Sequence, residues 1–123
     1  MRRTRIIAAL CLAGALGMAA CSGRSDDSLN AIAQDYVIMT LEIGEREEGY
    51  VDAYHGPPEW AETARVNPRT VEQLRVAAAA LTRRLEQLST RGLSDEEVQR
   101  RAYLIAHVRA ADTRLRMIAG EEP

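Results

Sequence analysis

Apolar residues recur at alternating steps of three and four along three segments of this 123-residue chain. That spacing puts them on one face of an α-helix, so each segment is predicted to be an amphipathic helix. We expect these helices at about residues 29–46, 70–89 and 94–119. The apolar positions are, in chain order, Leu29, Ile32, Tyr36, Met39 and Ile43; Val71, Leu74, Ala78, Leu81, Leu85 and Leu88; and Leu104, Val108, Ala111, Leu115 and Ile118.

Residues that cap helices stand at the predicted ends. Ser28 is placed to cap the first helix, and Gly120 is a natural C′ residue after the third. The second and third helices each follow a pair of residues with the spacing of a capping box, in which side chains and backbone N–H groups bond reciprocally. These pairs are Thr70 with Gln73 and Ser94 with Glu97.

The connection Arg91-Gly92-Leu93 is short, so the second and third helices are predicted to form an antiparallel hairpin. Two acid–arginine pairs at i,i+4 follow its turn, and each is expected to stabilise the third helix by about 0.2–0.5 kcal/mol. They are Glu96–Arg100 and Glu97–Arg101. No segment has the two-residue alternation of a strand, so the predicted fold class is all-α, with one helical domain at residues 29–120.

Between the first two helices lies a Tyr/Pro/Gly loop from Gly49 to Trp60, too rich in glycine and proline for a continuous helix. A short helix is expected to start at Pro57 or Pro58 and to run to about Arg65.

The N-terminal segment has the composition of an export signal. Arg2, Arg3 and Arg5 precede an uncharged run from Ile6 to Ala20. As a helix this run would cover about 22 Å, short of the roughly 30 Å hydrocarbon core of a bilayer. Residues 1–20 are therefore predicted to be a signal peptide rather than a membrane-spanning helix.

The end of that run, Met18-Ala19-Ala20-Cys21, resembles the lipobox of bacterial lipoproteins. The resemblance implies cleavage before Cys21, acylation of its thiol and membrane anchoring, with residues 21–28 as the lipidated cysteine and a polar tether. Ser22 after the cysteine resembles the outer-membrane pattern, so the expected location is the outer membrane, facing the periplasm. The alternatives are an ordinary secretory signal cleaved near Ala20 and an uncleaved anchor.

Composition narrows the possible roles of the remaining chain. The signal contains three of the 16 basic residues and none of the 18 acidic ones, which leaves a net charge of −5. This acidic balance argues against nucleic-acid binding. Cys11 is removed with the signal, so an intramolecular disulfide is not expected. No nucleophile triad, phosphate loop, dinucleotide motif or zinc-ligand spacing is present, so we predict no catalytic residue, metal or cofactor.

The loop concentrates the polar and aromatic residues that a site requires. Asp52, Tyr54, His55, Glu59 and Trp60 are the candidate site residues, and Asp52, His55 and Glu59 could meet as an acid/base or metal cluster. The alternative is an ordinary polar loop in which His55 packs on a neighbouring ring.

Two further groups of polar residues have a structural and a functional interpretation. His107 is expected to be a surface or half-buried helix residue. Glu45, Glu47 and Glu48 close the first helix, where acidic residues oppose the helix dipole. They would form either a solvated helix end or a metal or partner site.

The stretch Asp35-Tyr36-Val37, the segment Leu41 to Gly44 and the loop Gly49 to Trp60 together are similar to the N-terminal region of a family of large, helical, uncharacterised bacterial proteins that look like gluzincin-type zinc metallopeptidases. The similarity extends over roughly residues 29–120. In that family the zinc-binding His-Glu…His motif lies far downstream, and no position here matches it. The resemblance therefore implies a truncated N-terminal part that is not catalytic by itself.

Two functions follow from these observations. The first is an exported, lipid-anchored helical domain, equivalent to the N-terminal part of such a metallopeptidase-like lipoprotein. The alternative is a complete small periplasmic lipoprotein that binds a protein partner. In both, an apolar helix face is expected to be covered, either by the missing C-terminal domain or by the partner.

Overall fold

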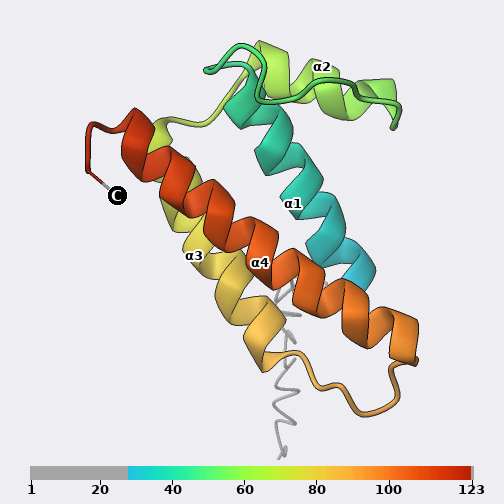
Figure 1. Ribbon diagram of the computed structural model, residues 1–123. Helices are drawn as coiled ribbons and strands as arrows, with labels where there is room; N and C mark the ends of the chain where they lie inside the picture. The colour runs from blue at the N-terminus through green and yellow to red at the C-terminus, as the bar shows by residue number, and fades with distance from the viewer. Residues whose placement is uncertain (1–27, 123) are drawn as a thin grey trace, which may run out of the picture.

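A computed structural model of the chain describes residues 28–122, and within that range every regular element is a helix (Figure 1). The four helices are α1 Leu29–Gly44, α2 Pro58–Val66, α3 Val71–Gln87 and α4 Asp95–Ile118. The all-α prediction is confirmed, and the three long helices lie within two residues of their expected bounds. The short helix expected near Pro58 is α2. The predicted signal, Cys21 and the tether before Ser28 lie outside the described residues.

The predicted caps determine where the helices begin. The backbone N–H of Ala31 donates to Ser28 Oγ over 3.2 Å. In the capping box of α3, the N–H of Gln73 donates to Thr70 Oγ1 over 3.2 Å and the N–H of Thr70 donates to Gln73 Oε1 over 2.9 Å. The box of Ser94 and Glu97 in front of α4 has the same two bonds, 3.2 and 2.8 Å long.

The C-terminal end of α4 closes in a Schellman motif. Gly120 takes a φ of +86°, in the left-handed region that glycine adopts without a Cβ clash. Its N–H donates to the carbonyl of Met117 over 2.9 Å, and the N–H of Glu121 donates to that of Arg116 over 2.9 Å. The expectation that Gly120 is the C′ residue is confirmed.

Helices α3 and α4 pack side by side as the predicted antiparallel hairpin, and α1 lies across both (Figure 1). Asn30 near the start of α1 bonds to Arg100 near the start of α4, and Glu47, three residues past the end of α1, bonds to Arg114 near the end of α4. These two helices therefore run in the same direction. Helix α2 packs on α1 alone, across its C-terminal end.

The apolar stripes predicted from the sequence face one another in a single core. Ile32, Met39, Leu85 and Val108 are examples of side chains with 0% exposure. Within residues 28–122, the large apolar side chains that remain exposed are scattered over α2, α3 and α4 rather than gathered on one helix face; they are Val66, Val76, Val98, Tyr103 and Met117. The stripes are thus covered within the chain itself.

The two i,i+4 pairs expected on α4 are not formed, because their arginines have tertiary partners instead. Arg100 Nη1 donates to Asn30 Oδ1 over 2.8 Å. Arg101 Nε donates to the Leu85 carbonyl over 2.6 Å, at the C-terminal end of α3. That bond satisfies a carbonyl left without a helical donor. None of the helices in the described part of the chain has both the length and the hydropathy of a bilayer-spanning segment.

The core makes a direct prediction for stability. Leu115 is fully buried between the hairpin and α1, so Leu115→Ala is expected to lower the free energy of unfolding by about 2–5 kcal/mol, as measured by urea denaturation of the full chain. Val76, on the same hairpin, is 61% exposed. Val76→Ala is the control and should change stability by less than about 0.5 kcal/mol. Equal losses for both variants would contradict this packing.

The capping box of α4 predicts a pH dependence. The backbone N–H and hydroxyl of Ser94 hold the pKa of the Glu97 carboxyl below its usual 4.5, because they bond its charged form. A lowered folded pKa adds stability above the unfolded pKa, and this contribution is lost as the pH falls through the folded pKa. Glu97→Gln keeps an acceptor for the N–H bond but has no charge. Glu97→Gln is therefore expected to be less stable than wild type at pH 7, and the difference should vanish in acid.

Thermal melts monitored by circular dichroism between pH 7 and pH 2.5 measure that difference. Glu96→Gln is the matched control, since it removes a charge from the same turn and leaves the capping box intact. If the two variants followed the same pH profile, the capping box would not be the source of the effect.

Candidate functional site

The loop between α1 and α2 is shaped by Tyr54. Its hydroxyl donates to the carbonyl of Pro57 over 3.0 Å, and its ring lies directly over Gly56. A Cβ at Gly56 would stand only 2.4 Å from the Tyr54 hydroxyl oxygen, so this approach requires glycine. Partial burial raises the pKa of the hydroxyl above 10.0, so the hydroxyl stays a donor into a more alkaline range than an ordinary tyrosine. Tyr54 therefore holds the loop closed on itself.

The polar candidates of the loop do not converge. Asp52, His55 and Glu59 are each exposed. In the range 28–122, no three His, Cys, Asp or Glu side chains come together in a way that would hold a metal ion. The reason is local. Helix α2 begins at Pro58 and includes Glu59 in its first turn, whereas Asp52 lies in the loop that precedes the helix. The arrangement described by these three residues is an ordinary polar loop.

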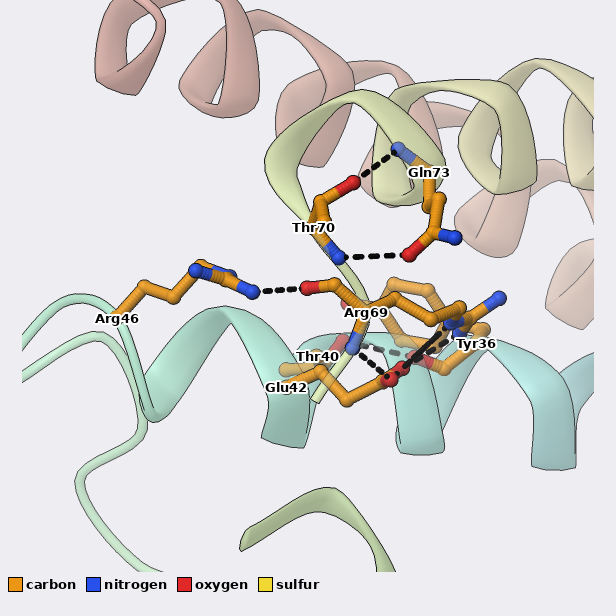
Figure 2. A network of polar contacts seen from close by, with 7 residues as sticks. All are labelled: Tyr36, Thr40, Glu42, Arg46, Arg69, Thr70 and Gln73. Carbon is orange, nitrogen blue, oxygen red and sulfur yellow. Dashed lines mark hydrogen bonds and ion pairs between the residues drawn. The ribbon is translucent and has the colours of Figure 1, made fainter. Parts of the chain in front are cut away.

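A buried ion pair that the sequence did not reveal joins α1 to the segment before α3 (Figure 2). Glu42 is 4% exposed, and its carboxylate accepts three kinds of N–H from Arg69. The backbone N–H and Nε of Arg69 lie 3.0 and 3.1 Å from Oε1, and Nη2 lies 2.5 Å from Oε2. Charge-assisted bonds of this bidentate kind are about twice as strong as neutral ones, so the pair fixes the path of the chain at Arg69.

The same segment is held from a second side. Arg46, two residues past the end of α1, donates to the Arg69 carbonyl, and Thr70 next to it starts the capping box of α3 (Figure 2). The backbone N–H of Arg69 is thus bonded to Glu42 of α1, and its carbonyl to Arg46 in the turn that follows. The only sequence signal for this contact is a charged residue inside the apolar run from Leu41 to Ile43.

Two more ion pairs attach α1 and the turn that follows it to the hairpin. Arg84 Nη1 lies 2.6 Å from Asp35 Oδ2, and Arg114 Nε lies 2.6 Å from Glu47 Oε2. Glu47 is therefore a tertiary contact, whereas Glu45 and Glu48 are exposed as expected for a solvated helix end.

His107 is half-buried on α4, as its sequence position suggested. Its ring stacks on Tyr103 with centroids 3.7 Å apart, and Nδ1 lies 2.9 Å from the Tyr103 carbonyl. Burial raises the pKa of nearby Tyr36 above its usual value, and the charge of an ionised Tyr103 would raise it further. The stacked pair lies at the surface, since Tyr103 is 57% exposed.

Two grooves flank α1. One, of about 290 Å³, lies against α3 and has the paired Arg69 and Arg84 in its wall. The other, of about 300 Å³, lies on the side of α1 that carries α2, with Trp60 in one wall and Arg100 in the other. Of the predicted loop residues, Trp60 is the one that lines either of these two grooves. Neither groove has a nucleophile beside a base in its lining.

In comparisons with known proteins, no protein family, curated protein or solved structure matches this chain.

The buried pair predicts an asymmetry among the acidic residues. Glu42→Gln is expected to lower the free energy of unfolding by about 2 kcal/mol, because it removes charge-assisted bonds to a buried carboxylate whose partner Arg69 is 39% exposed. Glu62→Gln is the matched control, since its pair with Arg65 is exposed and worth less than about 1 kcal/mol. Urea titrations at pH 7 measure both, and equal losses would show that the buried pair does not stabilise the fold.

Proposed function

We propose that this protein is exported and anchored to a membrane by acyl chains on Cys21. The observation that carries the proposal is the run of small residues Met18-Ala19-Ala20 directly before Cys21, preceded by arginines and a short apolar segment. Stable anchoring requires more than one acyl chain, which is what the lipoprotein pattern supplies. Ser22 favours the outer membrane, with the helical domain in the periplasm.

The start of the helical fold supports this division of the chain. Leu29 is 6% exposed and is the first residue of α1, directly after its cap Ser28. The packed domain therefore begins where the proposed tether is expected to end. The polar residues from Ser22 to Asp27 provide the length between lipid and fold.

For the domain itself, we propose equivalence to the N-terminal helices of a metallopeptidase-like lipoprotein. The proposal rests on the similarity of Asp35 to Gly44 and of the loop Gly49 to Trp60. It assigns no catalytic residue to this chain, because the zinc-binding motif of the family has no counterpart here.

A second candidate is a small periplasmic lipoprotein that binds a protein partner without help from a further domain. Two observations favour it. The apolar stripes of α1, α3 and α4 already bury one another, and a groove with mixed apolar and polar lining remains open beside them.

The anchor is tested by metabolic labelling with an alkyne analogue of palmitate in a bacterium that processes lipoproteins. Wild type is expected to be labelled and to fractionate with membranes, and Cys21→Ser is expected to lose the label because it lacks the thiol that is acylated. Cys11→Ser is the control and should be labelled like wild type. Equal labelling of wild type and Cys21→Ser would exclude the anchor.

A further inference from the structure

The groove between α1, α2 and the start of α4 combines apolar and polar residues in its lining. The apolar residues are Ala33, Val37 and the half-buried Trp60. The polar residues are Asn30, Gln34 and Arg100. No carboxylate lines it. The groove therefore has one cationic end and an apolar surface next to it.

Arg100 differs from the other arginines that join α1 to the hairpin. Arg84 and Arg114 each have a carboxylate partner, whereas none of the ion pairs found among residues 28–122 includes Arg100. Its neighbour Glu97 accepts the Ser94 N–H over 2.8 Å in the capping box. Arg100 is instead held over 2.8 Å by the neutral amide of Asn30, which orients the guanidinium. The charge of Arg100 acts on Glu97 through space and lowers the pKa of that carboxyl, but no carboxylate is in ion-pair contact with the guanidinium.

The groove stays open because of how α2 is attached. Helix α2 contacts α1 but neither α3 nor α4 among the described residues (Figure 1). The groove lined by Trp60 and Arg100 is open at the surface. Trp and Arg are the residue types that contribute most to binding when they flank a pocket.

We propose that this groove binds the carboxyl-terminal tail of a partner protein. The terminal carboxylate pairs with Arg100, whose guanidinium forms bidentate bonds to carboxylates. An aliphatic terminal side chain packs on Ala33, Val37 and Trp60. The peptide backbone bonds to the amides of Asn30 and Gln34. A fatty acid has the same charge, but half of the lining is polar, and an acyl chain has no bonds to offer those amides. This inference does not depend on lipidation of Cys21.

Trp60 is the only tryptophan of the chain, so its fluorescence reports on this groove alone. The full chain, reconstituted in phosphatidylcholine vesicles, is titrated with acetyl-Ala-Ala-Leu-Leu carrying a free carboxylate. We expect a saturable change in Trp60 emission, and about tenfold weaker binding for the same peptide as its C-terminal amide.

Two variants with the same change in charge test the role of Arg100. Arg100→Gln is expected to weaken binding of the free acid about tenfold and to remove the preference over the amide. Arg91→Gln, at an exposed site in the α3–α4 connection, should bind like wild type. Circular dichroism melts confirm that both variants fold.

Three results would overturn the proposal: no saturable change with the free acid, equal binding of acid and amide, or equal binding by wild type and Arg100→Gln. Tighter binding of decanoate than of the peptide would assign the groove to an acyl chain and would also overturn it.

Discussion

Every other helix of this fold packs on α1, and α1 must therefore be apolar on more than one face. Ile32, Met39 and Ile43 face the hairpin, while Leu41 is buried on a different face of the same helix. An isolated helix of 16 residues is only marginally stable in water, so the burial of these faces supplies most of its stability. The hairpin and α2 are positioned by their contacts with different faces of α1.

Glu42 is a charged residue that is buried on α1. A carboxylate buried among apolar side chains is costly unless its oxygens are bonded. Arg69 supplies both its side chain and its backbone N–H, so the chain between α2 and α3 must pass at one particular place. The contact therefore fixes the position of α3 relative to α1, because Thr70, the N-cap of α3, is the next residue in the chain.

The sequence predicted those parts of the fold that depend on local chemistry. Helix period and caps such as Ser28 and Gly120 depend on neighbours within a turn, and these predictions were confirmed. The tertiary ion pair of Glu42 was missed because its partner lies 27 positions away. The loop residues were grouped by proximity in sequence, yet of these only Trp60 lines one of the two grooves beside α1. Arg100, which lines the same groove, was expected to pair with Glu96. It bonds to Asn30 of α1 instead, because spacing along one helix gives no information about a competing residue on another helix.

The attachment of α2 to a single neighbour has a consequence for the dynamics of the protein. Loss of α2 would remove its contact with α1, including the buried Ala64, but would leave the core of α1, α3 and α4 closed. Helix α2 is thus a cooperative unit of its own, with a free energy of local opening well below that of global unfolding. Its amide hydrogens should exchange with solvent earlier than those of the hairpin, and anything that bridges Trp60 to α1 would slow that exchange.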